Sequence, residues 1–312
     1  MMVLRSMLYV PGNSMRMITS AASRPADAVI LDLEDAVPIA DKETARIMIR
    51  DSIRLFRPTE TCTFVRVNSL NSGLTAEDLE FVVVDELDGV MLPKTEGSSD
   101  VVKLDEMLAK TEKSSGLKPE SLKIIPLIET AKGVVRAFEI ASASSRVVAV
   151  AFGAGDYYRD LGRDVSLLSR DETELLFARS QIVVASRAAG TQAVDTPFLG
   201  LLTDKERFLN GTKLALQLGF KGKQVIHPSQ IEPVNSIFSP SRNEIDSAKR
   251  LVAAFGEAQA RGLGAASFEG RMIDCMSYKQ AKDLLGIAEA MAKRESIRDK
   301  GPLTLDLSQI FS

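Results

Sequence analysis

The chain has 312 residues, a length that suits either two ordinary domains or one large α/β barrel. Hydrophobic residues make up 45%, enough for a sizeable core, whereas aromatic residues make up 5% and Trp is absent, which argues against the stacking platforms of proteins that bind single-stranded nucleic acid. The formal net charge is −3 and the Lys and Arg residues are scattered, so the clustered positive charge of a polyanion-binding protein is missing. We therefore expect no nucleic-acid partner.

The sequence shows no sign of export or membrane insertion. The apolar run within residues 1–13 is too short for a signal peptide, and no stretch approaches the roughly 18 apolar residues of a membrane span. Cys62 and Cys275 are the only cysteines, fit no metal-binding spacing and indicate a reducing compartment. We expect a cytoplasmic protein with no membrane partner.

Short β-rich runs alternate along the chain with longer segments in which apolar residues recur at helical spacing. Eight such runs occur, at residues 6–10, 28–33, 63–68, 89–93, 123–129, 147–153, 191–197 and 223–227. Strands that alternate with helices pair in parallel through crossovers, and eight units are the number in a TIM (β/α)8 barrel. A doubly wound open sheet is the alternative, but no G-x-G-x-x-G motif follows the first run.

The pattern changes after the eighth run. We expect a helix entered by Pro240 with Ser241 as its cap, then a loop or short hairpin near residues 263–272, then a second amphipathic helix from about residue 277. Residues 1–240 are therefore assigned to a catalytic TIM barrel. Residues 241–312 are assigned to an extension that is too small for a secure core of its own and must pack on the barrel or on a neighbouring subunit.

Polar side chains gather where the expected strands end, and in a TIM barrel that face carries the active site. In chain order they are Glu34, Asp35, Arg66, Asn68, Lys94, Glu129, Thr130, Asp156, Asp195 and His227. Four or five carboxylates would face one Arg and one Lys, and uncompensated carboxylates raise each other's pKa. A divalent cation resolves this imbalance, and oxygen ligands without a His or Cys cluster favour Mg²⁺ or Mn²⁺ over Zn²⁺.

Glu129 and Asp156, on adjacent strands, are the expected metal ligands, because Mg²⁺ usually takes one or two protein carboxylates. Glu34 and Asp35 would then orient metal-bound water or the neighbouring cationic side chains. Plainer explanations exist, since Glu129 could be a helix cap or a first-turn acid and Asp156 a turn former.

For three other residues we favour a structural role over a catalytic one. Asp32 lies in mid-strand, where an Arg partner best explains its charge. His227 is the only His, and no Ser or Cys nucleophile pattern accompanies it, so we expect a packing or pocket residue. Lys94 is expected to form a salt bridge rather than a Schiff base.

Seven motifs span nearly the whole chain: RSMLYVPGN, DAVILDLEDAVPIADKETAR, FVRVNS, MLPK, PLIET, FGAGDYYRDLG and GFKGKQVIHPSQIEPVNSIFSPS. In this order they resemble the citrate lyase β-subunit-like family of the HpcH/HpaI aldolase/citrate lyase superfamily, which includes malyl-CoA and citramalyl-CoA lyases. The resemblance implies a TIM barrel with a C-terminal lid, in a homotrimer or a hexamer built from trimers. It also implies a Mg²⁺-dependent carbon–carbon lyase that acts on a 3-hydroxyacyl thioester.

Position by position, the resemblance assigns the metal to Glu129 and Asp156, and substrate binding and oxyanion stabilisation to Arg66. The stretch EGRMIDCMSYKQA is similar to the lid motif of the CoA-thioester lyases, whose catalytic acid/base would be Asp274. In those relatives the lid closes over the barrel of a neighbouring subunit.

The same resemblance places Tyr9, Gly155 and His227 along the CoA groove. One departure concerns the turn after the first strand, where some malyl-CoA lyases have an Arg. This chain has Ser14 there and Arg16 two residues on, which leaves the CoA phosphate contacts at that turn open.

The implied reaction is a retro-Claisen cleavage of a malyl-CoA or citramalyl-CoA type thioester into acetyl-CoA and a 2-oxoacid, which could be glyoxylate, pyruvate or oxaloacetate. Two alternatives stay open. One is a citrate lyase β subunit that cleaves a citryl thioester on an acyl carrier protein. The other is a catalytically impaired scaffold that keeps a metal site.

Overall fold

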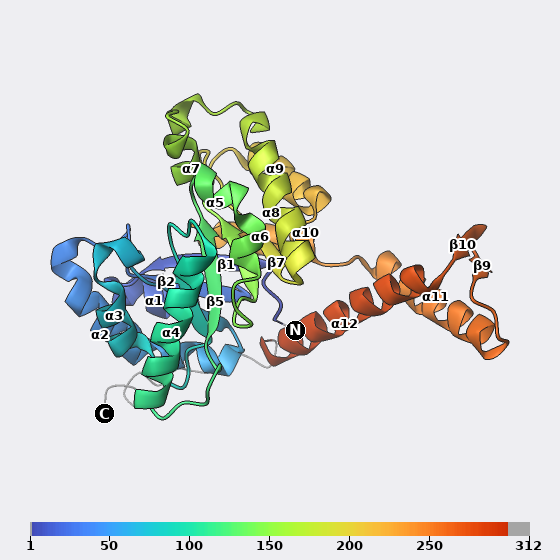
Figure 1. The fold of residues 1–312 in the computed structure, drawn as a ribbon. Coiled ribbons are helices and arrows are strands. Elements are labelled where there is room, and N and C mark those ends of the chain that lie inside the picture. Colours follow the sequence, from blue (N-terminus) through green and yellow to red (C-terminus); the bar gives the residue numbers. More distant parts are fainter. Residues whose placement is uncertain (1, 299–312) are drawn as a thin grey trace. The chain divides into compact units, whose positions relative to one another are not determined.

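The computed structural model of the chain describes residues 2–298, which fall into two compact units. We call residues 2–238 the barrel unit and residues 239–298 the C-terminal unit (Figure 1). Among the described residues, no helix combines the length and the apolar character needed to cross a bilayer.

All eight expected runs are strands of one closed parallel barrel, in the order β1 to β8. They are β1 (Ser6–Pro11), β2 (Ala28–Asp32), β3 (Cys62–Arg66), β4 (Gly89–Leu92), β5 (Lys123–Ile128), β6 (Ala149–Phe152), β7 (Gln192–Asp195) and β8 (Gly222–Val225). The barrel closes because β1 pairs with β2 on one side and with β8 on the other. The TIM barrel prediction is confirmed, and the open doubly wound sheet is excluded.

Strands buried on both faces explain why the eight runs are predominantly apolar and show no regular alternation. One set of side chains, including Met7, Ile30, Phe64 and Ile125, fills the barrel interior. The alternate set packs outward against the helices. These helices are α1 (Met15–Ala22), α2 (Lys42–Ser52), α3 (Thr75–Val82), α4 (Ser98–Ser114), α5 (Ala131–Val135), α6 (Ala137–Ala141), α7 (Ala154–Asp160), α8 (Leu176–Ala189), α9 (Lys205–Leu218) and α10 (Ile231–Phe238).

The C-terminal unit consists of two helices joined by a hairpin. Ser241 caps α11 (Arg242–Ala260) in a reciprocal capping box with Glu244, as its sequence position predicts. The hairpin of β9 (Ala266–Phe268) and β10 (Arg271–Ile273) turns at Glu269 and Gly270, both with positive φ, and α12 (Cys275–Arg298) follows. The expected helix, hairpin and helix are all present. Packing of this unit on a neighbouring subunit stays a prediction.

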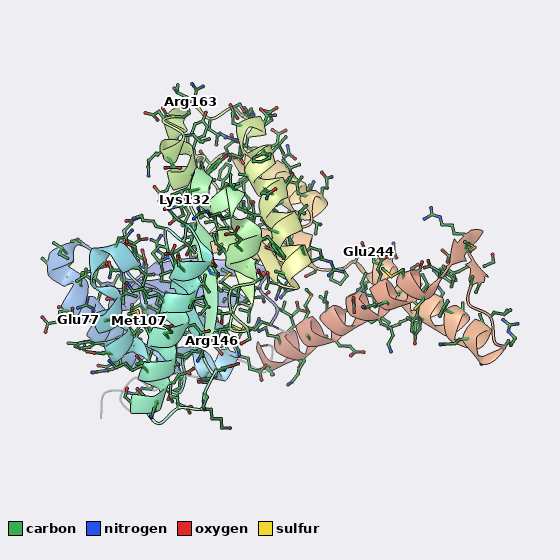
Figure 2. The ribbon with its side chains drawn as sticks, in the orientation of Figure 1. Glu77, Met107, Lys132, Arg146, Arg163 and Glu244 are labelled. Carbon is green, nitrogen blue, oxygen red and sulfur yellow. The ribbon has the colours of Figure 1, made fainter. Side chains whose placement is uncertain are left out.

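Buried ion pairs fix both ends of the barrel. Arg146, before β6, donates two hydrogen bonds of 2.7 Å to the buried carboxylate of Glu112 on α4. Figure 2 shows Arg146 at the opposite end of the barrel from Lys132, which follows β5. Since active sites occupy the carboxyl ends of the strands, the Arg146 pair contributes to stability and not to the site.

Asp195 at the end of β7 is fully buried, and two cations hold it. Arg179 on α8 donates to both of its carboxylate oxygens at 2.8 and 2.9 Å, and Lys223 on β8 donates at 2.6 Å. Burial raises the pKa of Asp195, but the charges of Arg179 and Lys223 outweigh it and hold the pKa below its usual range. Asp195 is therefore a structural carboxylate, although its position in the sequence groups it with the site.

Replacing Asp195 by Asn should destabilise the barrel by about 3–5 kcal/mol, because Arg179 and Lys223 would lose the charge that compensates them. Urea unfolding followed by circular dichroism measures this. The matched control is Asp51→Asn, whose ion pair with Arg50 is exposed, and it should change stability by less than about 1 kcal/mol. Similar losses of unfolding free energy in the two variants would contradict the structural role of Asp195.

Candidate active site

Arg66 is anchored at the barrel mouth by Asp32. The two residues pair directly in the register of β2 and β3. The Arg66 guanidinium donates from Nε and Nη2 to the two oxygens of Asp32 at 2.7 and 2.6 Å, in the bidentate geometry that fixes its plane. The Tyr9 ring lies 4.9 Å from the guanidinium carbon. The predicted Arg partner of Asp32 is confirmed, but Asp32 is the last residue of β2 and does not lie in mid-strand.

Glu34 bridges the two cations of the site. Its carboxylate lies 3.2 Å from Nη1 of Arg66 and accepts a 2.8 Å hydrogen bond from Nζ of Lys94. Burial raises the pKa of Glu34, and the charges of Arg66 and Lys94 offset this only in part. Asp35, next to it, is more than half exposed and lies 3.7 Å from Nζ of Lys94. Glu34 therefore orients the cationic side chains, whereas Asp35 contributes little to that geometry.

Lys94 has a left-handed backbone conformation, with φ of 53°, which is strained for a long side chain. This conformation lets its backbone N–H donate to Oε2 of Glu129 at 2.9 Å while its side chain reaches Glu34. Partial burial lowers the pKa of the Lys94 ammonium, but the hydrogen bond to Glu34 outweighs it and raises the pKa above its usual value. A salt bridge for Lys94 is confirmed, and a charged ammonium is unsuited to Schiff-base formation.

Glu129 directly follows β5 and is 3% exposed. It is not a helix cap, because Thr130 caps α5 by accepting from the Gly133 N–H at 3.1 Å. Burial and the charge of Glu34 raise the pKa of Glu129 from 4.5 to about 8. The residues around Glu129 thus leave its negative charge undercompensated.

Asp156 lies in the first turn of α7, with its side chain one-third exposed and bound to Arg159 at 2.7 Å. Its negative charge contributes to the raised pKa of Glu129, so the two carboxylates are close enough to interact electrostatically. The Asp156 side chain is thus partly open to solvent, whereas Glu129 is buried.

The remaining candidates in the barrel unit differ in their environments. Tyr9 is partly buried, its hydroxyl donates to Gln224 at 2.9 Å, and burial raises its pKa. Gly155 lies on α7 near the side chain of Leu199. His227 is exposed and accepts from the Ser229 N–H through Nδ1, as the cap of a short 3-10 turn.

Two residues that the sequence analysis missed shape this site. Lys42 is buried on α2 and donates to the carbonyl oxygens of Leu33 and Glu34, which holds the segment after β2 in place. Gly153 must be a glycine, because a Cβ atom there would lie 2.7 Å from Oε1 of Glu129. Both lie inside motifs of the chain, but their contacts arise only in the folded barrel.

Asp274 belongs to the C-terminal unit and is the cap of α12. Its carboxylate accepts hydrogen bonds of 2.9 Å from the backbone N–H and the hydroxyl of Ser277. These hydrogen bonds lower the pKa of Asp274, which is fully exposed. The structure thus brings together Arg66, Glu34, Glu129 and Asp156 in the barrel unit. Asp274, in the C-terminal unit, is a solvated helix cap.

The donor set at the barrel mouth fits a hard divalent cation. Among the described residues, no group of three or more His, Cys, Asp or Glu side chains is placed to hold a metal. Glu129 and Asp156 form a pair of carboxylates, which is the number that Mg²⁺ takes when water and substrate complete its coordination. Gly153 leaves room for the Glu129 side chain, and the undercompensated charge of Glu129 suits such an ion.

A closed parallel barrel with converging carboxylates at the carboxyl ends of its strands defines a class of enzyme scaffold. The chain belongs to the HpcH/HpaI aldolase/citrate lyase family, whose model matches residues 5–228. This family membership and the named relatives make it a carbon–carbon lyase.

Three relatives are similar to this chain over most of its length. The citrate lyase subunit beta of Escherichia coli is 40% identical over 93% of this chain and 95% of its own length. The mitochondrial citramalyl-CoA lyase of Homo sapiens is 35% identical over 93% of this chain and 87% of its own. The CitE protein of Mycobacterium tuberculosis, solved with magnesium, acetoacetate and coenzyme A, is 32% identical with a TM-score of 0.69, over 91% of this chain and 98% of that one.

Replacing Glu129 by Gln should stabilise the protein in EDTA at pH 8.5 but not at pH 5. The folded-state pKa of about 8 exceeds the unfolded value of 4.5, so the wild-type protein loses stability as the pH rises between these values. Gln removes this loss, on the order of a few kcal/mol, and its amide oxygen can still accept from the Lys94 N–H.

Thermal melts in EDTA at the two pH values measure the difference, with exposed Glu139→Gln on α6 as the control. If the Glu129→Gln variant melts no higher than the wild type at pH 8.5, Glu129 does not bear an undercompensated charge.

Proposed function

We propose that the protein is a Mg²⁺-dependent lyase that cleaves a 3-hydroxyacyl-CoA thioester of the malyl-CoA or citramalyl-CoA type into acetyl-CoA and a 2-oxoacid. The observation that carries this proposal is the buried, undercompensated carboxylate of Glu129 beside a rigidly anchored Arg66. Relatives at 35% and 40% identity are named citramalyl-CoA lyase and citrate lyase subunit beta, which supports it.

Glu129 and Asp156 would hold the metal. When bound there, Mg²⁺ supplies Lewis-acid polarisation of the substrate's carboxylate and hydroxyl oxygens. Gly153 keeps the space in which the Glu129 side chain lies, and the Lys94 N–H fixes the orientation of its carboxylate. The protein contributes a preformed site, so the substrate meets ligands that need little rearrangement.

Arg66 would stabilise the oxyanion that develops as the carbon–carbon bond breaks. Asp32 already occupies Nε and one N–H of Nη2, so the guanidinium cannot rotate, and its remaining N–H groups keep one direction. A donor fixed before the reaction stabilises developing charge without reorganisation, which is the principal electrostatic contribution to such steps. Tyr9, Gly155 and His227 would line the groove for the thioester arm.

Asp274 would donate a proton to the enolate carbon of the departing acyl thioester, or remove it in the condensation direction. We propose that it comes from the C-terminal lid of a neighbouring subunit in a trimer or hexamer. As a solvated cap its pKa is low, which favours the base form. Exclusion of water around Asp274 in the assembled site would raise its pKa and favour the acid.

A second candidate is a citrate lyase β subunit that acts on a citryl thioester carried by an acyl carrier protein. The 40% identity with the Escherichia coli subunit, over nearly the whole of both chains, favours it. A catalytically impaired scaffold is a third candidate, against which the retention of Arg66, Glu129, Asp156 and Asp274 argues. The cytoplasmic location stays a prediction.

The test is a cleavage assay without any partner protein. Purified protein with Mg²⁺ is incubated with malyl-CoA, citramalyl-CoA or citryl-CoA, and acetyl-CoA and the 2-oxoacid are followed, with EDTA as the control. EDTA-sensitive cleavage of a free CoA thioester is expected. Absence of cleavage with all three, together with cleavage of a citryl thioester on an added carrier protein, would favour the citrate lyase subunit instead.

Replacing Asp274 by Asn should reduce turnover by at least about 100-fold, the lower range of a positioned general acid/base, while leaving Mg²⁺ binding intact. Because an Asn side chain still caps α12, the fold should be kept. Steady-state turnover and calorimetric Mg²⁺ titration separate the two effects.

Mixing the Asp274→Asn and Glu129→Gln chains provides the control for a site shared between subunits. Denatured together and refolded, two inactive variants should recover part of the activity if each site draws on two chains. Near-normal turnover of Asp274→Asn alone would remove Asp274 from the mechanism.

A further inference from the structure

Gln224 is a fully buried amide in a barrel whose interior is otherwise mostly apolar. It lies on β8, and its Nε2 atom donates to the carbonyl oxygens of Phe152 at 2.8 Å and of Asp195 at 3.1 Å, where β6 and β7 end. Its Oε1 atom accepts from the Tyr9 hydroxyl on β1 at 2.9 Å. Both N–H groups and the carbonyl oxygen of this amide are therefore used, as a buried amide requires.

These hydrogen bonds fix the direction in which the amide of Gln224 points. Two backbone carbonyl oxygens can only accept, so they hold the NH₂ group, and Oε1 is left to face Tyr9. Burial raises the pKa of the Tyr9 hydroxyl, which stays protonated and remains a donor. Gln224 thus holds the Tyr9 ring by its hydroxyl end.

The Tyr9 ring in turn lies against the guanidinium of Arg66, with 4.9 Å between the ring centroid and Cζ. A cation at this distance over an aromatic ring is attracted to it. Asp32 on β2 holds Nε and Nη2 of the same guanidinium, and the ring adds a contact from β1. The position of Arg66 therefore depends on two other strands.

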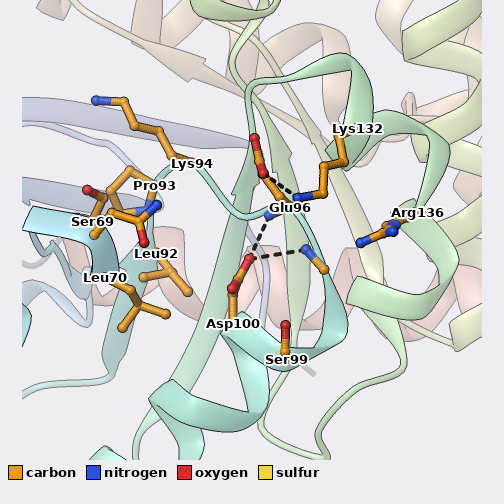
Figure 3. Close-up of a pocket in the computed structure, with 12 residues that line it drawn as sticks. Ser69, Leu70, Leu92, Pro93, Lys94, Glu96, Ser99, Asp100, Lys132 and Arg136 are labelled. Atoms are coloured by element: carbon orange, nitrogen blue, oxygen red, sulfur yellow. Dashed lines mark hydrogen bonds and ion pairs between the residues drawn. The ribbon is translucent and has the colours of Figure 1, made fainter.

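On the outer side, the site adjoins a polar pocket of about 210 Å³ beside Lys94 (Figure 3). Charged groups of opposite sign occur together in this pocket, such as Lys132 and Glu96, whose side chains lie 2.8 Å apart. Because these charges largely cancel, the pocket leaves the electrostatics of Arg66 to its own neighbours.

We propose that Gln224 and Tyr9 are positioning residues, in which Gln224 fixes the Tyr9 ring and the ring fixes the guanidinium of Arg66 for the developing oxyanion. The inference rests on the proposed function of Arg66. It gives Tyr9 a role apart from lining the groove, because its hydroxyl points to Gln224 inside the barrel.

Filling the barrel interior would not require this pair. Phe and Met would occupy similar volumes without any polar group to satisfy, so space alone does not explain a phenol and an amide. What the hydrogen bond adds is a defined ring position, since a fully satisfied buried polar network is rigid. A donor that stabilises developing charge depends on such rigidity.

Gln224→Met and Tyr9→Phe test the pair, because each keeps the side-chain volume and removes the hydrogen bond between them. Each should lower kcat for malyl-CoA or citramalyl-CoA on the order of 10-fold, since a shift of about 1 Å in a site costs up to about 100-fold. Gln192→Met is the matched control. This glutamine, at the amino end of β7, donates to the Met2 carbonyl at 2.9 Å, and kcat should be unchanged.

The same variants in an Arg66→Lys background separate positioning from loss of folded protein. Lys keeps a positive charge beside Asp32 but lacks the planar guanidinium. If the pair acts through that group, Gln224→Met and Tyr9→Phe should cause no further loss of kcat in this background. Losses by the same factor in both backgrounds would overturn the inference.

Crystal structures of the variants test the inference without any reaction. In Gln224→Met the Tyr9 ring and the Arg66 guanidinium should move by about 0.5 Å or more relative to the barrel backbone, the tolerance of a productive site, and in Gln192→Met they should not. An unmoved guanidinium in Gln224→Met would overturn the inference, whatever the activity. A moved guanidinium together with a wild type that cleaves no thioester would overturn only the proposed reaction.

Discussion

The charge balance at the carboxyl ends of β2 to β6 governs the architecture of the site. Arg66 compensates Asp32, Arg66 and Lys94 compensate Glu34 only in part, and the buried Glu129 is left undercompensated. The register of β2 and β3 places Asp32 opposite Arg66. The strained backbone of Lys94 lets its side chain pair with Glu34. Burial of a carboxylate whose pKa is raised in this way costs stability, a cost that the proposed binding of a cation at Glu129 would offset.

The buried ion pair at the amino end of the barrel serves stability, whereas the carboxyl end holds both the structural Asp195 cluster and the proposed site. The Arg146 and Glu112 pair, at the amino end, is fully satisfied by hydrogen bonds and buried. The carboxyl end instead contains a left-handed lysine and a glycine that is required by close approach of Glu129. Backbone strain and close packing at this end thus fall on the residues for which chemistry is proposed, which is expected of a functional site in a stable scaffold.

The fold was predictable from the sequence because barrel strands are apolar on both faces and helices separate them at regular intervals. The Arg partner of Asp32 was predictable because a buried charge on a barrel strand needs one. The structural role of Asp195 was not predictable, because Arg179 on α8 and Lys223 on β8 reach it only in the folded barrel. The need for Gly153 likewise follows from a three-dimensional contact with Glu129 and not from a motif.

Calorimetric titration of Mg²⁺ into the wild type and Glu129→Gln at pH 7.5 tests most directly whether the undercompensated carboxylate is a cation site. We expect saturable binding of one ion per chain in the wild type and at least about tenfold weaker binding in the variant, since a charged ligand is lost. Wild-type protein without measurable binding, or equal affinity in the two proteins, would contradict it.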